Sequence, residues 1–181
     1  MRATDVGRVV PLDGPTLGPP ELDAVVEIAY RAMAADGRFD EAEIEAFRCV
    51  LSRLRALATP AVGAGAYRSI VTHGAPRAVA DADLDALLDR LRASVGDTPA
   101  PARRFGFTRQ STLRALAEPL SPAARELAYK VAYAISLADL DVPAEEAELQ
   151  TELAVALELD PARAAALSHE TVAALGEGSE P

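Results

Sequence analysis

The sequence predicts an all-α protein, a helical bundle of about seven to eight helices that contains two pseudo-repeated helix-turn-helix units. Half of the residues are apolar, and most of these are Ala and Leu, the strongest helix formers. Aromatic residues make up only 4% of the chain, so side chains that favour strands are scarce. Apolar residues recur at spacings of three and four, which is the periodicity of an amphipathic helix.

This periodicity places the helices along the chain. The first begins at Glu21, where regular structure replaces a segment rich in Pro and Gly, and the second begins with Asp40 as its N-cap. Ser121-Pro122 is a strong helix start, with Ser as N-cap and Pro in the first turn. The predicted helices cover residues 21–35, 40–58, 67–71, 81–95, 113–117, 122–139, 143–157 and 161–172.

The distribution of Pro and Gly sets the domain boundaries. Residues 1–20 hold four prolines and three glycines, so we expect a flexible N-terminal arm. Residues 21–175 are expected to form a single all-helical domain, and residues 176–181 a frayed C-terminus.

Charge and cysteine content narrow the function classes. The net charge of −10 argues against nucleic acid, whose phosphates need clustered Lys and Arg. No stretch reaches the roughly 20 apolar residues of a membrane span, so we expect no membrane insertion and a soluble, cytoplasmic protein. A single cysteine, Cys49, excludes an internal disulfide and is expected to be a buried structural thiol. Cations or a protein partner with a basic surface are the ligands that this acidic protein favours.

Two segments of the chain resemble each other. Residues 29–45 read AYRAMAADGRFDEAEIE and residues 132–148 read AYAISLADLDVPAEEAE. An offset of 103 residues places Tyr30 on Tyr133 and Glu43 on Glu146. Each copy predicts a helix, a tight turn and a second helix. Because one helical hairpin cannot bury both of its apolar stripes, we expect the two copies to pack together.

The pattern Ala-Asp-Gly-x-Phe-Asp-x-x-Glu, echoed later as Ala-Asp-x-Asp-Val-x-x-Glu-Glu, resembles the TerB-like (tellurite-resistance TerB) family. The resemblance covers residues 22–57 and 122–168. It implies an all-helical bundle with internal pseudo-symmetry, an association with tellurite resistance and stress response, and metal binding at the two acidic turns. Carried over by position, the family's metal residues are Asp36 and Glu43 in the first unit, and Asp139 and Glu146 in the second. Leu140 stands where the family has glycine, which departs from the pattern.

The acidic residues of the two turns allow two interpretations. Asp36 and Asp139 follow helix C-termini, where negative charge is unfavourable, so their recurrence suggests a purpose. If the turns meet, a cluster of carboxylates converges, and its oxygen atoms suit calcium, magnesium or manganese rather than zinc. In the other interpretation these residues only cap helices and stay solvated. The candidate metal residues are Asp36, Asp40, Glu43, Asp139, Asp141 and Glu146.

No arrangement of nucleophile and base indicates catalysis, so we expect no enzyme. The leading hypothesis is a non-catalytic TerB-like module that binds a divalent cation. A metal-free, acidic helical scaffold for protein interaction is the alternative. A metal-dependent hydrolase ranks last, because no residue outside the acidic turns suggests a substrate pocket.

Overall fold

The computed structural model describes residues 6–34, 41–58, 80–95, 106–138 and 143–176. Within these ranges the chain forms seven α-helices, one short 3₁₀ helix and no β-strand, which confirms the predicted all-α class. In chain order the elements are η1 (Gly7–Val9), α2 (Pro19–Met33), α3 (Glu41–Leu57), α4 (Asp81–Val95), α5 (Gly106–Ala117), α6 (Pro122–Ser136), α7 (Pro143–Ala156) and α8 (Pro161–Gly176).

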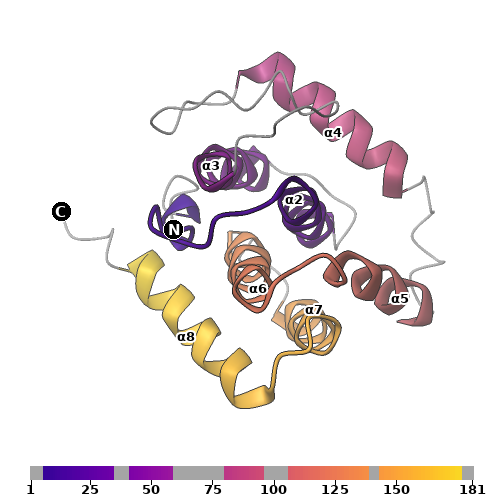
Figure 1. Ribbon diagram of the computed structural model, residues 1–181, viewed down its shortest axis with the longest axis vertical. Helices are drawn as coiled ribbons and strands as arrows, with labels where there is room; N and C mark the ends of the chain where they lie inside the picture. Colours follow the sequence, from indigo (N-terminus) through magenta and orange to yellow (C-terminus); the bar gives the residue numbers. More distant parts are fainter. Residues whose placement is uncertain (1–5, 35–40, 59–79, 96–105, 139–142, 177–181) are drawn as a thin grey trace.

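Helices α2 and α6 form the centre of the bundle (Figure 1) and make the most extensive helix–helix contact among the described residues. Nine residues of each helix are buried. The completely buried ones include Ala29, Ala128 and Ala132, whose small side chains let two helix axes approach closely. The core of the protein is built outward from this pair.

A single carboxylate joins the two central helices at their starts. Glu21 lies in the first turn of α2, and its Oε2 accepts a hydrogen bond from the backbone N–H of Gly18 at 2.9 Å. Its Oε1 accepts another from the N–H of Ser121, the N-cap of α6, at 3.0 Å. The two N-termini therefore lie side by side, and α2 and α6 run in the same direction.

The helix that follows each central helix runs back along it. The N–H of Leu17, just before α2, donates to the carbonyl of Leu57 at the end of α3 at 2.9 Å. In the second half, Arg125 at the start of α6 pairs with Glu158, which directly follows α7. Both hairpins are therefore antiparallel. In each, the end of the second helix lies beside the start of the central helix.

The two halves repeat this arrangement. The 103-residue offset seen in the sequence carries α2 onto α6 residue for residue. η1 and α5 are equivalent in the two halves. η1 packs on α3 and also contacts α6, whereas α5 packs on α7 and also contacts α2. Figure 1 shows α3 and α7 on opposite sides of the central pair, with α4 and α8 at opposite edges. The predicted pair of repeated helix-turn-helix units is confirmed.

The described part of residues 1–20, for which a flexible arm is expected, packs against the bundle. Val6, Val10 and Leu17 are completely buried, and η1 packs against α3 and α8. Prolines and glycines prevent a long helix here, but the apolar side chains between them still gain free energy by joining the core. Pro-rich composition predicted irregular backbone and not the packing of this segment.

Other boundaries differ less. α5 is longer than the predicted helix at residues 113–117 and begins at Gly106, while α6 ends at Ser136, three residues early. The short helix expected at residues 67–71 lies outside the described residues, as do residues 177–181 of the expected frayed C-terminus.

The position of Glu21 predicts a pH-dependent stability. Its hydrogen bond from the Gly18 backbone is the main cause that lowers the pKa of this carboxyl below its ordinary value of 4.5, and Ser121 adds to the effect. Because the pKa is lower in the folded protein than in the unfolded chain, the ionised carboxyl group stabilises the fold at pH values above the unfolded-state pKa. This stabilisation is lost as the pH falls through the folded-state pKa. Glu21→Gln should therefore reduce the loss of stability between about pH 5 and pH 3.

Urea unfolding at a series of pH values measures this effect. At pH 7 the Glu21→Gln protein should be less stable by about 1–2 kcal/mol, the cost of weakening hydrogen bonds to a charged group. Glu118→Gln, which changes an exposed carboxylate near the end of α5, is the control. Parallel pH profiles for wild type and Glu21→Gln would contradict the assignment.

Candidate functional site

One end of the bundle gathers four helix termini. Because α2 and α6 are parallel and both hairpins are antiparallel, the C-termini of α2 and α6 and the N-termini of α3 and α7 lie at the same end of the molecule. The acidic turns of the two repeats belong to the chain between these termini. These four termini are the described ends of the segments that carry the two predicted half-sites.

Glu43 is the only one of the six predicted metal residues whose side chain the structure describes. It lies in the first turn of α3 and is 5% exposed, whereas Glu41, in the same turn, is exposed. A buried carboxylate is costly unless it is paired or bound, and Glu43 is engaged in contacts within the protein. The positive end of the α3 dipole also favours a charge at this position.

The other predicted residues lie partly outside the described part of the chain. Asp36, Asp40, Asp139 and Asp141 belong to residues 35–40 and 139–142, which the structure does not describe. Glu146 lies near the start of α7, as predicted from its helical pattern, but only its backbone is described. The predicted cluster as a whole therefore stays a prediction.

The described ranges hold neither a metal-binding cluster nor a helix that could span a membrane. No group of three or more His, Cys, Asp or Glu side chains in these ranges comes together closely enough to hold a metal ion. None of the helices described is both long and apolar enough to cross a membrane.

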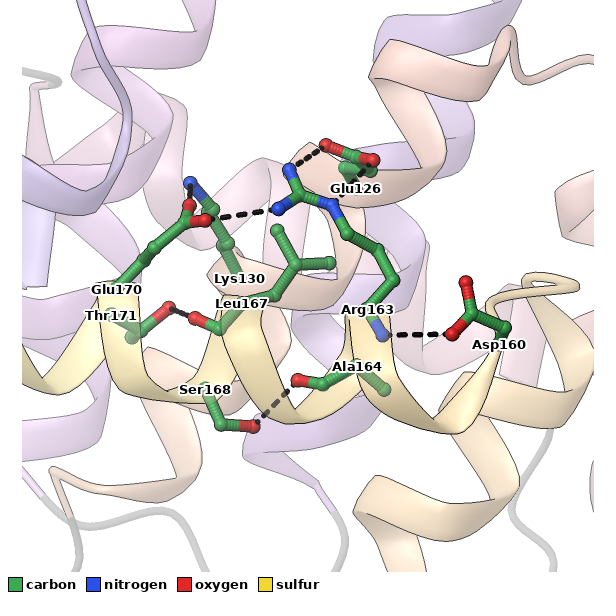
Figure 2. A network of polar contacts seen from close by, with 9 residues as sticks. All are labelled: Glu126, Lys130, Asp160, Arg163, Ala164, Leu167, Ser168, Glu170 and Thr171. Carbon is green, nitrogen blue, oxygen red and sulfur yellow. Dashed lines mark hydrogen bonds and ion pairs between the residues drawn. The ribbon is translucent and has the colours of Figure 1, made fainter.

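A network of polar contacts joins α6 to α8 (Figure 2). Arg163 donates to both carboxylate oxygens of Glu126, from Nε at 2.8 Å and from Nη2 at 2.6 Å, and its Nη1 donates to Glu170 at 3.0 Å. Lys130 also pairs with Glu170. Asp160 accepts from the backbone N–H of Arg163 at 2.9 Å and so caps the start of α8.

The charged side chains of this network pair with one another. Hydrogen bonding from Arg163 lowers the pKa of Glu126, and hydrogen bonding from Lys130 lowers the pKa of Glu170. The same contact with Glu126 raises the pKa of the Arg163 guanidinium. Because both carboxylates are engaged by cationic side chains of the protein, the network acts as a clamp between α6 and α8 and not as a ligand site.

Hydroxyl groups form one hydrogen bond between α6 and α8 and another within α8. Tyr129 of α6 and Ser168 of α8 share a hydrogen bond of 3.1 Å between their hydroxyl oxygens. Thr171, which is 1% exposed, donates back to the carbonyl of Leu167 at 2.8 Å. These polar atoms therefore need no external ligand.

The surroundings of the cysteine favour its neutral thiol form. Cys49 is half-buried rather than fully buried as expected, and its thiol lies 3.8 Å from the carboxylate of Glu45. Burial is the main cause that raises the pKa of the Cys49 thiol, and Glu45 adds to it. Reactive thiols need a lowered pKa, so the structural role expected for Cys49 is consistent with its surroundings.

The repeated tyrosines have different surroundings. Tyr30 is 2% exposed and packs edge-on against Phe47 of α3, with ring centroids 6.4 Å apart. Tyr133 is half-buried and stacks on Tyr129 of its own helix. The 103-residue offset brings Gln150 to the position of Phe47, so the second hairpin lacks the aromatic partner of the first.

Comparison of this chain with protein-family models, with curated proteins and with solved structures finds no match. The resemblance to the TerB-like family therefore rests on the repeated acidic pattern and remains a hypothesis.

Sequence reasoning did not identify the clamp between α6 and α8. The spacing of Glu126 and Lys130, and that of Arg163 and Glu170, places each pair on one face of its helix. This signal shows that two charged faces exist. That these faces meet is decided by the packing of α8 on α6.

The clamp predicts a measurable coupling between Glu126 and Arg163. A double-mutant cycle with Glu126→Gln and Arg163→Gln should give about 0.5–1 kcal/mol at low salt, because both side chains are partly exposed. The coupling should shrink at 1 M salt, where screening shortens the reach of charges to about 3 Å.

Urea unfolding of the four proteins measures the coupling. The exposed pair Asp89 and Arg92 on α4, which belongs to a single helix, is the control and should give about 0.3 kcal/mol. Equal values for the two pairs would show that the clamp does not join α6 to α8 energetically.

Proposed function

We propose that this protein is a non-catalytic, TerB-like module that binds a divalent cation at the end of the bundle where α2 and α6 finish. Calcium, magnesium and manganese are the candidate ions, since the predicted ligands are all carboxylates. By the same resemblance, the process it serves is the response to tellurite or general chemical stress.

The observation that carries the proposal is the common direction of α2 and α6. Each repeat places an acidic segment directly after one of these helices. Had the helices been antiparallel, the two segments would have left opposite ends of the bundle, about 22 Å apart for a helix of this length. The parallel arrangement, held by Glu21 and Ser121, removes this obstacle to a shared site.

Glu43 gives further support. Its carboxylate is buried in the first turn of α3, at the same end of the bundle, and offers the hard oxygen donor that these cations prefer. Glu146 occupies the equivalent position of the repeat and lies near the start of α7. With Asp36, Asp40, Asp139 and Asp141, these residues would supply the ligands.

The alternative is a metal-free scaffold whose acidic surface docks a basic partner. The net charge of −10 supports it. Binding that weakens with salt and is indifferent to divalent ions would favour this alternative.

Thermal unfolding in EDTA and then in calcium, magnesium or manganese tests the proposal. An ion that binds only the folded protein at 100 times its dissociation constant should add about 2.7 kcal/mol of stability. The gain should be lost in Asp36→Ala and Asp139→Ala proteins, because the proposed site draws on both repeats.

Glu43→Gln and Glu41→Gln form a matched pair, since both change a glutamate in the first turn of α3 but only Glu43 is buried. Glu43→Gln should lose the stabilisation by the ion and Glu41→Gln should keep it. The cation proposal would be contradicted if no ion raised the melting temperature, or if both variants lost the stabilisation equally. Either result would favour the metal-free scaffold.

A further inference from the structure

Helix α4 lies at the edge of the bundle, over α2 and α3 (Figure 1). Its leucines at positions i, i+3, i+4 and i+7 are all buried, and their exposed fractions are 1% for Leu84, 1% for Leu87, 4% for Leu88 and 6% for Leu91. The residues between them are exposed. α4 is therefore an amphipathic helix whose leucine stripe belongs to the hydrophobic core. The surface beside it, bounded by Arg48 and Arg55 on α3 and by Asp23 on α2, is here termed the α4-binding face.

Charged side chains lie along both margins of this face. On the α3 side, Arg48 pairs with Asp81 of α4, and the charge of Asp83 acts on Arg55. On the α2 side, burial raises the pKa of the Asp23 carboxyl and the charge of Arg90 on α4 counteracts it. α4 thus presents carboxylates to the arginines of α3 and an arginine to the carboxylate of α2.

The contact is less intimate than the others in the bundle. Every other helix described closely approaches the backbone of at least one neighbouring element along several residues, whereas α4 does so with no other element of the described part. In addition, the Nη2 atom of Arg55 is buried and has no hydrogen-bond partner in the described part of the protein, which is a costly arrangement. Among the described residues, α4 is therefore held mainly by its side chains, beside a buried donor that has no partner there.

We propose that the α4-binding face is a docking site for the amphipathic helix of a partner protein, and that α4 occupies it in the free chain. The partner helix carries leucines at i, i+3, i+4 and i+7 and carboxylates in its first turns. This is the mode in which an apolar helix face is laid on a complementary surface. The proposal does not depend on cation binding.

Charge complementarity identifies this occupant. The α3 margin offers the guanidinium groups of Arg48 and Arg55, which match carboxylates at the start of an incoming helix. A glutamate at the position of Asp83 is one methylene longer and can reach further toward the unsatisfied donor of Arg55. A partner helix with such a glutamate should displace α4.

Hydrogen exchange on the unmodified chain tests the first half of the proposal. The amides of α4 should exchange more than about 100-fold faster than those of α2 and α6, because α4 opens as a separate unit. Exchange of α4 only together with α2 and α6 would overturn the proposal.

A labelled peptide of residues 80–95 tests the second half. Leu87→Asp in the full chain places a charge in the stripe and should detach α4, so the peptide should bind this protein at least about tenfold more tightly than wild type. Ala86→Asp, at the exposed neighbouring position, is the control and should behave as wild type. If the Leu87→Asp chain fails to fold by circular dichroism, the exchange measurement decides the proposal.

Charge substitutions test the identity of the occupant. Adding Arg48→Glu to the Leu87→Asp chain should weaken the peptide about tenfold, and an Asp81→Arg peptide should recover most of this loss. The Asp83→Glu peptide should bind more tightly than the original. Peptide affinity that is the same with and without these charge substitutions would overturn the assignment. So would a wild-type dimer that the peptide dissociates, because the occupant would then be α4 of a second copy.

Discussion

The parallel packing of α2 and α6 is the constraint on which the rest of the structure depends. Parallel helices set two N-termini, with their unpaired N–H groups and partial positive charges, next to each other. Glu21 resolves this unfavourable arrangement, because one carboxylate accepts from the N-cap N–H of its own helix and from that of its neighbour. The repeat has Ala124 at the position equivalent to Glu21, so the cap is shared between the halves rather than duplicated. The helices of the two halves occupy related positions, but the contacts that hold them differ.

From this contact the positions of the remaining helices follow. Each hairpin returns to the N-terminal end of its central helix, through Leu17 and Leu57 in one half and through Arg125 and Glu158 in the other. The opposite end then collects the C-termini of α2 and α6 and the starts of α3 and α7. Glu43 is buried at that end, which places a carboxylate where the helix dipole of α3 favours one.

The two outer helices occupy related places but are held differently. α8 packs closely on α6, and a clamp of four charged side chains and a hydrogen bond between hydroxyl groups secures it. α4 lies beside α2 and α3, with a buried leucine stripe and charged pairs at its margins, and within the described residues the buried Nη2 atom of Arg55 has no hydrogen-bond partner. Local stability differs across a protein according to such contacts. Of the two outer helices, α8 is therefore firmly held, and α4 is the one suited to replacement by a partner helix.

Periodicity, composition and the 103-residue offset determined the helical class, most helix positions and the pairing of the two repeats, because these depend on local propensity and on which face of each helix is apolar. They also marked Glu43 and Glu146 as equivalent residues at helix starts. The burial of the segment around Val6 and Leu17, the bridge made by Glu21 and the clamp around Arg163 were decided by the tertiary structure alone. Each of these depends on which surface lies opposite a side chain. Residues 100 positions apart, such as Glu21 and Ser121, show no pattern in the sequence that predicts their contact.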